Sequence, residues 1–189
     1  MRLLRLKEGY PTAKVELWCE DEHRLGLKPI IRKIWSPIGQ RPQVSVHQRY
    51  KWTYLYAFAR PTSGEVHWLI LPTVSAQAFS VALENFAKEV GASKNKRILL
   101  VVDKAGWHTA KKKLKVPEGT HLEFLPSHSP ELQPAERLWP LSSNEGVAYC
   151  HFEEIEELEE ALVERCVALC NQPELVRAYT RYHWWPQAA

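Results

Sequence analysis

The sequence has little of what marks secreted, membrane-bound or disulfide-stabilised proteins. Its few cysteines contain no Cys-x-x-Cys pair, and no basic, apolar and small-residue leader opens the chain. A reducing cytoplasm is therefore the expected compartment rather than secretion. The strongest apolar run, Ile98 to Val102, is far shorter than the ~20 residues that a membrane helix needs, so we expect no membrane partner.

Internal repeats and low-complexity linkers are also missing. Hydrophobic residues make up 45% and charged residues 25% of the 189 residues, which is typical of a folded globular protein and not of a disordered one. A chain of this length can bury a core without disulfides or other cross-links. We expect one domain over residues 1–189.

The formal net charge of +3 hides a strong separation of charge along the chain. Six glutamates fall within residues 153–160, whereas basic residues cluster elsewhere, at Arg2, Arg5, Lys7, Arg32, Lys33, Arg41, Lys104, Lys111, Lys112, Lys113 and Lys115. The rest of the chain is thus clearly basic, which favours a polyanionic partner. For the cluster at 111–115 alone, a solvated lysine-rich helix face is an equally good interpretation.

Alternating apolar residues predict an antiparallel β section in the first half of the chain. Alternate positions from Val15 to Cys19 are apolar and share one strand face with Asp21, which we expect to close the first strand. The further strands expected here are a hairpin, Tyr50–Ala59 with Glu65–Leu71, and an inserted β-ribbon, Ile30–Trp35 with Gln43–His47.

From residue 76 onward the pattern changes to alternating helices and strands. Apolar residues recur at helical spacing from Ala76 to Val90, and the apolar run Arg97–Val102 suits a strand buried on both faces. The elements expected next are a short lysine-rich helix Thr109–Leu114, a strand His121–Leu125, a helix from Pro134, a glutamate-rich helix with Ile155, Leu158 and Leu162 on its apolar face, and a final helix Glu174–Arg181. Three antiparallel strands, a helix and then two parallel strands alternating with helices is the order of the ribonuclease-H-like α/β fold, a mixed sheet flanked by helices.

Two aspartates are expected at carboxyl ends of strands, where open α/β sheets form ligand crevices: Asp21 and Asp103. Two carboxylates brought together repel each other unless a divalent cation compensates them, and oxygen ligands suit Mg²⁺ or Mn²⁺. Glu136 is a third candidate because, with Gln133 as cap and Pro134 as first helical residue, it lies in the first turn and points toward the strand ends. Taken singly, each acid has an ordinary explanation as a strand end, a turn or a helix start.

Neighbouring polar and aromatic residues are weaker candidates. His108 falls near the expected mouth of the crevice, where it would contact phosphate or order a ligand. Glu20 and Glu22 alternate to the strand face opposite Asp21. Trp139 is expected to pack its helix onto the sheet.

Three motifs together resemble one enzyme family. They are Cys19-Glu-Asp21-Glu, Val-Val-Asp103-Lys-Ala-Gly-Trp-His108 and Leu125-Pro-Ser-His-Ser-Pro-Glu-Leu-Gln-Pro-Ala-Glu136-Arg-Leu-Trp139. In this order they are similar to the DDE catalytic domain of mariner-like transposases from bacterial insertion sequences, and Trp35-Ser-Pro-Ile-Gly-Gln-Arg-Pro42 resembles that family's Trp-x-Pro-x-Gly segment. The chain has Lys104 and Gln133 where the family usually has asparagine.

The resemblance implies metal-dependent DNA strand cleavage and strand transfer at transposon ends. Asp21, Asp103 and Glu136 would hold Mg²⁺ or Mn²⁺ as a pair of ions with Asp21 shared between them. His108 and Lys104 would support these acids or contact phosphate. The residues expected to contact DNA are Arg32, Lys33, Arg41, Lys111, Lys112 and Lys113.

The resemblance also implies partners and a location. These are double-stranded DNA, both transposon ends and target, a second copy of the chain in a homodimer, and the bacterial nucleoid within the cytoplasm. Such transposases carry an N-terminal helix-turn-helix reader, which we expect to be absent here, fused from an upstream reading frame, or removed. Two other functions stay open: an inactive, transposase-derived DNA-binding protein, and a ribonuclease-H-type nuclease that prefers RNA–DNA hybrids.

Overall fold

The computed structural model describes residues 2–27, 36–40, 50–110, 112–144, 147 and 150–186, and a five-stranded sheet runs through them in the order β3-β2-β1-β4-β5. The strands are β1 (Lys14–Gly26), β2 (Trp52–Arg60), β3 (Glu65–Leu71), β4 (Lys96–Val102) and β5 (Thr120–Phe124). Strands β1, β2 and β3 pair antiparallel, whereas β4 pairs parallel with both β1 and β5. The predicted mixed sheet of the ribonuclease-H-like fold is therefore confirmed.

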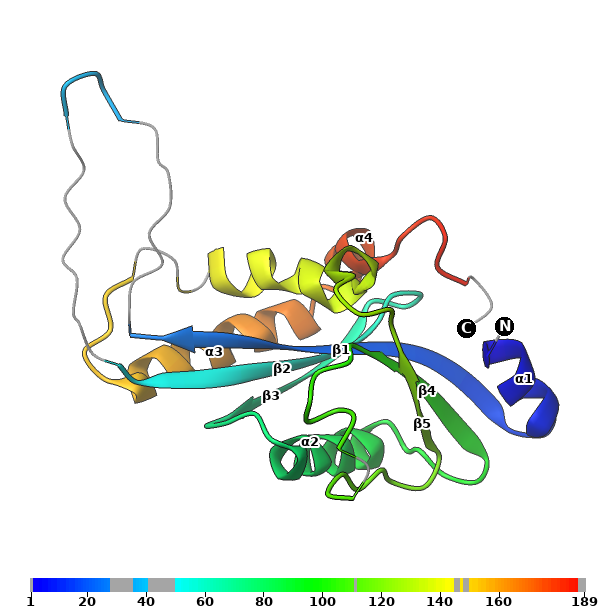
Figure 1. Cartoon of the computed structure of the whole chain (residues 1–189). Coiled ribbons are helices and arrows are strands. Elements are labelled where there is room, and N and C mark those ends of the chain that lie inside the picture. The colour runs from blue at the N-terminus through cyan, green and yellow to red at the C-terminus, as the bar shows by residue number, and fades with distance from the viewer. Residues whose placement is uncertain are drawn as a thin grey trace.

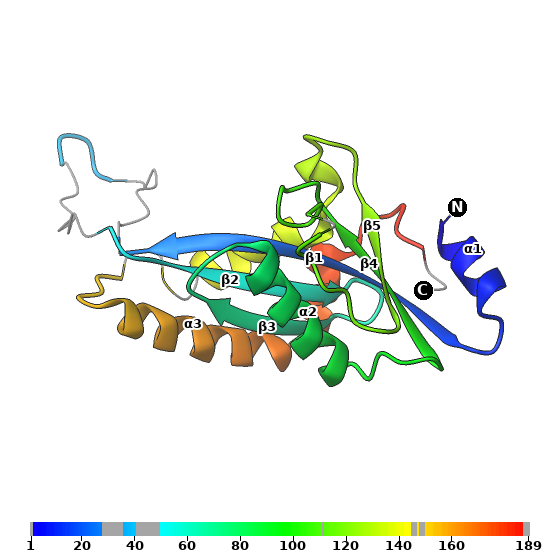
Figure 2. The same ribbon diagram turned by 60° about the horizontal axis from the view of Figure 1, so that its bottom comes forward.

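Helices cover both faces of this sheet (Figure 1). They are α1 (Arg2–Gly9), α2 (Ala76–Glu89), the short 3₁₀ helices η1 (Pro130–Leu132) and η2 (Pro134–Leu138), the short π-helix η3 (Pro140–Asn144), α3 (Ile155–Cys170) and α4 (Pro173–Thr180). Helix α2 packs on one face, while η2, α3 and α4 pack on the other. Helix α1 lies beside β5, where the side chain of Arg2 pairs with Glu123 (Figure 2). In the part of the chain that the structure describes, no helix is both long and apolar enough to cross a membrane.

The alternation of side chains along β1 divides the core between these two layers. Leu17 and Cys19 are buried against the η2 and α3 side of the sheet. Trp18 is buried on the opposite side, edge-on to Phe86 of α2 with ring centroids 5.0 Å apart. The same alternation sends acidic residues further along β1 to opposite faces.

Three predicted elements differ from the structure, each for a local reason. Strand β1 does not end at Asp21, because its antiparallel pairing with β2 continues to Gly26. The helix expected from Pro134 begins there, but as a 3₁₀ helix of 5 residues followed by a π-helix, Pro140–Asn144, and Pro140 lacks the N–H that a regular α-helix would need at this point. The lysine-rich helix Thr109–Leu114 is absent from the described residues of that segment, which has a single large apolar side chain to bury and forms a turn instead.

One element was not anticipated, and one predicted element falls partly outside the described residues. Helix α1 has a basic, weakly apolar sequence that gave no clear signal. The predicted ribbon strands, Ile30–Trp35 and Gln43–His47, lie outside the residues that the structure describes. The turn between them is described at residues 36–40, where Ser36 Oγ donates to the Gln40 carbonyl at 2.7 Å.

Candidate active site

Asp21 and Asp103 are neighbours because β1 and β4 run parallel in register. The two strands pair as far as Cys19 and Val101, so the next residues on the same face are Asp21 and Asp103. Asp21 thus lies in the middle of β1 but immediately beyond the point where β4 stops. Strand β1 continues alongside β2, where Asp21 pairs with Ala57.

Glu136 completes this cluster from the η2 turn. A pocket of about 300 Å³ is lined by Asp21, Asp103 and Glu136 together with Lys104 and the loop 125–130. Larger pockets exist elsewhere on the protein, but this one collects the acids of all three motifs. The structure therefore brings the three predicted carboxylates to one place, while their catalytic role stays a prediction.

The environment of the pocket acts differently on each carboxyl group. Burial raises the pKa of Asp21 well above its ordinary value, and the negative charge of Glu136 raises it further. Burial also raises the pKa of Glu136. By contrast, the hydrogen bond with His108 lowers the pKa of Asp103. Two of the three carboxyl groups therefore resist ionisation, while the third is readily ionised. A divalent cation bound to their oxygens would offset the repulsion between the negative charges when all three are ionised.

Trp139 does more than the packing predicted for it. Its side chain is 7% exposed and stacks on His23 with ring centroids 5.0 Å apart. Its indole Nε1–H also donates to Asp21 Oδ2 at 3.0 Å, which partly offsets the effect of burial on the pKa of Asp21. Sequence gave no signal for this hydrogen bond, because the two residues are 118 positions apart.

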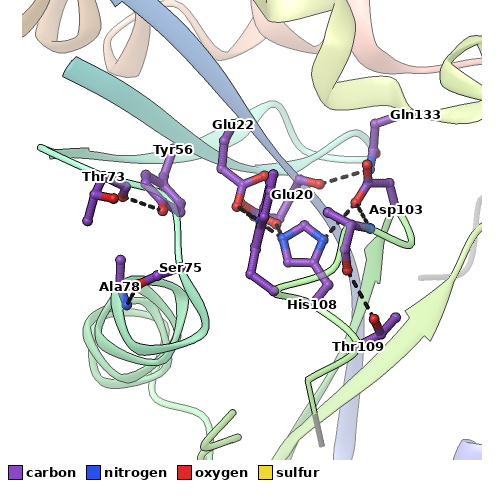
Figure 3. Close-up of polar contacts among 12 residues, drawn as sticks. Glu20, Glu22, Tyr56, Thr73, Ser75, Ala78, Asp103, His108, Thr109 and Gln133 are labelled. Carbon is purple, nitrogen blue, oxygen red and sulfur yellow. Dashed lines mark hydrogen bonds and ion pairs between the residues drawn. The ribbon is translucent and has the colours of Figure 1, made fainter. Parts of the chain in front are cut away.

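His108 lies behind Asp103 rather than in the mouth of the crevice (Figure 3). Its Nδ1 is 2.7 Å from Asp103 Oδ1, and its Nε2 is 3.0 Å from Glu22 Oε1. Burial alone would lower the pKa of His108, but its hydrogen bonds with Asp103 and Glu22 raise the pKa to about 10. His108 is 1% exposed, so its surroundings favour the expected role of ordering a ligand residue over the expected contact with phosphate, and the role itself stays a prediction.

Gln133 occupies the predicted position before the first helical residue but does not act as a cap. Its side chain makes no capping hydrogen bond to the η2 turn. Instead, Gln133 Nε2 donates to the backbone carbonyl of Glu20 at 2.8 Å and ties the turn to β1. The longer side chain of glutamine is thus used to span from the turn to the strand.

The predicted DNA-binding residues are only partly placed. Lys112 and Lys113 are exposed on the loop that follows His108. Arg32, Lys33, Arg41 and Lys111 lie outside the described residues. A second, larger groove of about 1000 Å³ is lined by Arg2, Arg5 and Lys104, among others, so Lys104 contributes to both the groove and the acidic pocket.

Comparison with known proteins gives one family match. The family model described as DDE superfamily endonuclease matches residues 16–159. A curated relative, the uncharacterized protein y4pE/y4sA of Sinorhizobium fredii (strain NBRC 101917 / NGR234), is 31% identical over 121 residues, covering 64% of this chain and 84% of that protein.

Among solved structures, the chain is similar to Mos1 transposase complexes. The mariner Mos1 paired end complex with Mg matches with a TM-score of 0.58 and 21% identity, covering 88% of this chain and 56% of that one. The corresponding complex with Mn matches with a TM-score of 0.55 and 18% identity, covering 95% and 61%. The Mos1 strand transfer complex matches with a TM-score of 0.52 and 20% identity, covering 96% and 59%. The chain therefore spans roughly three fifths of the length of these proteins and shares their fold.

Proposed function

The chain belongs to the DDE superfamily of endonucleases, and we propose that it is the catalytic domain of a mariner-like DNA transposase. In this role it would cleave DNA strands at transposon ends and join them to a target. The observation that carries the proposal is the meeting of Asp21, Asp103 and Glu136 in one pocket, each contributed by a separate motif.

The donor set of this pocket fits Mg²⁺ or Mn²⁺, because it offers carboxylate oxygens and no thiolate. A pair of such ions, when bound, activates an attacking water or 3′-hydroxyl and stabilises the leaving oxygen. Asp21, Asp103 and Glu136 would hold these ions through their carboxylate oxygens. The Trp139 indole would hold Asp21 in place through its 3.0 Å hydrogen bond, and His108 would hold Asp103 through its 2.7 Å contact.

The DNA would lie across the acidic pocket and the adjoining basic groove. Lys104 lines both, so its ammonium group is placed to contact a phosphate next to the scissile bond. We further propose a homodimer that pairs two transposon ends, and a helix-turn-helix reader supplied by another segment or reading frame. Paired-end complexes of Mos1 transposase are among the structural neighbours, which supports the pairing of two ends.

Metal-dependent nicking tests this function. Purified protein is incubated with supercoiled plasmid carrying the element's end, with Mg²⁺ or Mn²⁺ and with chelator. We expect nicking by the native protein with metal and none by Asp103→Asn, which removes a charge but little volume. Absence of nicking by the native protein would support the inactive DNA-binding alternative, and faster cleavage of an RNA–DNA hybrid would support the ribonuclease-H-type alternative.

A further inference from the structure

Glu20 is an anomaly on the side of the sheet away from the acidic pocket. Its side chain is 0% exposed, and neither carboxylate oxygen has a hydrogen-bond partner. Such a group carries a large desolvation cost, so a buried carboxylate without hydrogen-bond partners calls for an explanation such as a bound ion.

Glu16, on the same face of β1, shows how this protein stabilises a buried glutamate in the ordinary way. Its side chain is 1% exposed and pairs with Lys14 at 2.7 Å, with Lys96 at 3.2 Å and with Arg60 at 3.3 Å. No lysine or arginine among the described residues makes such a pair with Glu20. Its one ion pair among the described residues is with His108 Nε2 at 3.7 Å, a nitrogen that lies closer to Glu22, at 3.0 Å, so Glu20 receives less compensation than Glu16.

The side chains that surround Glu20 are those of a metal site. His108 Nε2 lies 3.7 Å from Glu20 Oε2 and 3.0 Å from Glu22 Oε1. One donor atom from each of the three residues lies within 4.8 Å of the others. Ligands bound about 2.1 Å from one cation are separated by roughly 3.0–3.5 Å in octahedral or tetrahedral geometry. The two measured separations are close to this range without any rearrangement of the backbone.

The orientation of His108 supports the same interpretation (Figure 3). Its Nδ1 faces Asp103 Oδ1 at 2.7 Å, which is the carboxylate–histidine contact that fixes the ring of a metal-ligating histidine. A cation that displaces the proton of Nε2 and leaves the one on Nδ1 would meet a lone pair directed toward Glu20 and Glu22. His108 is also among the residues that line the groove of about 1000 Å³.

We propose that Glu20, Glu22 and His108 bind one divalent transition-metal ion, such as Mn²⁺, at a site separate from the Asp21, Asp103 and Glu136 pocket. One imidazole nitrogen and two carboxylates favour a transition metal over Mg²⁺, which prefers oxygen ligands only. The ion stabilises the centre of the sheet and, through the ring of His108, fixes the position of Asp103. This proposal does not depend on the transposase activity, because its ligands and its readout are different.

The test is electron spin-echo spectroscopy of Mn²⁺ bound to the whole chain, after chelator treatment and desalting. A directly coordinated imidazole gives a ¹⁴N modulation, which coordination by the carboxylates of Asp21, Asp103 and Glu136 alone would not give. We expect this modulation in the native protein and its loss in His108→Asn, whose amide can still donate to Asp103. Glu20→Gln, nearly equal in shape, should bind one Mn²⁺ fewer per chain; should it not fold, Glu22→Gln serves the same purpose.

Two matched variants separate the sites. His128 lines the acidic pocket, whereas His108 does not, so His128→Asn should keep the ¹⁴N modulation if His108 is the ligand. Glu136→Gln should keep it as well while weakening binding at the acidic pocket. The proposal is overturned if saturated native protein shows no ¹⁴N modulation, if His108→Asn retains it, or if Glu20→Gln binds as many ions as the native chain. Loss of nicking with the modulation intact would instead contradict the proposed function alone.

Discussion

Asp21 and Asp103 are adjacent on one sheet face, yet their surroundings differ in polarity. Asp21 is enclosed by Trp139 and the η2 turn, and burial raises its pKa well above the ordinary value. Asp103 contacts His108 and the backbone N–H of Ala105 at 2.8 Å, and its pKa is lowered. At the scale of single residues, the cluster is therefore arranged to keep one acid ionised while another holds a proton until a cation arrives.

This arrangement predicts how stability depends on pH without metal. A carboxyl group with a raised folded-state pKa contributes stability that is complete below its ordinary pKa, 3.8 for Asp21, and is lost as pH rises through the folded value. Metal-free protein should thus melt at a lower temperature at neutral than at mildly acidic pH, and Asp21→Asn should reduce that difference. Thermal denaturation across this pH range with chelator is the measurement.

Asp103→Asn is the control for the pH prediction. Because the pKa of Asp103 is lowered, its contribution has the opposite sign and is lost as pH falls. The decline of melting temperature toward neutral pH should persist in this variant. Equal pH profiles of melting temperature for native protein and Asp21→Asn would show that the raised pKa of Asp21 is not the cause of the pH dependence.

Trp139→Phe tests the hydrogen bond that positions Asp21. Phenylalanine keeps an aromatic ring against His23 but removes the Nε1–H donor, which lies 3.0 Å from Asp21 Oδ2. A hydrogen bond to a charged group contributes about 1.5–3 kcal/mol, so the Mg²⁺ concentration for half-maximal nicking should rise roughly tenfold or more. Unchanged metal dependence, with the fold retained by circular dichroism, would limit Trp139 to packing.

At the scale of elements, the strands were predictable and the helical turns were not. The hairpin of β2 and β3 and the buried strand β4 follow from short-range patterns, since their apolar residues recur at the period of two or in a continuous run. The 3₁₀ form of η2 and the turn in place of the lysine-rich helix depend on a missing donor and on a lack of apolar surface, which propensity alone does not weigh.

The same distinction applies to the candidate site. Asp21, Asp103 and Glu136 were recognisable because each stands at the end of an apolar run or the start of a turn, and the sheet topology brings those positions together. The contact of Glu22 with His108 joins residues 86 positions apart and depends on how the loop after β4 folds back. No local sequence pattern predicts a contact between residues so far apart in the chain. The alternation of side chains along a strand could therefore place Glu22 on a face of the sheet but could not identify its partner.

The packing of the hairpin turn against α4 gives a prediction at this scale. Gly64 has a φ of +80°, and an added Cβ would lie 1.8 Å from the carbonyl oxygen of Pro173 at the start of α4. Gly91 has a φ of +68° but open space around it. Left-handed backbone costs a non-glycine residue about 1–2 kcal/mol, so Gly91→Ala should lower the melting temperature by roughly 2–8 °C.

Gly64→Ala should lower the melting temperature further than Gly91→Ala, because it adds a backbone clash to the same conformational cost. Differential scanning calorimetry of the two variants under identical conditions measures the difference. A drop at Gly64 no larger than that at Gly91 would mean that α4 moves away from the hairpin at little cost.

At the scale of the whole molecule, acidic and basic side chains lie on different surfaces. The glutamate-rich helix α3 packs on the face of the sheet opposite α2, with exposed Glu156 and Glu157 in its first turn. The basic groove with Arg2, Arg5 and Lys104 opens beside β5, next to the acidic pocket. A DNA backbone would be repelled from α3 and attracted to the groove, which orients the substrate toward the carboxylates.

The salt dependence of DNA binding tests this orientation. Phosphate contacts release counterions, so the logarithm of affinity falls with the logarithm of salt concentration by about 0.9 for each phosphate neutralised. If Lys112 and Lys113 each contact a phosphate, the double variant Lys112→Ala/Lys113→Ala should lower that slope by about 2. Lys88→Ala is the matched control, because Lys88 is exposed on α2 and pairs with Glu84 at 2.9 Å.

Binding is measured by fluorescence anisotropy over a salt series, with duplexes of the transposon end and of random sequence. We expect similar affinities for the two duplexes, since phosphate contacts carry no direct sequence information. Fusion to a helix-turn-helix segment should add preference for the end, because such a segment reads base edges in the major groove. An unchanged slope in the lysine double variant would place the DNA path away from the loop after β4. Strong preference of these 189 residues alone for the end duplex would place sequence recognition within the catalytic domain itself.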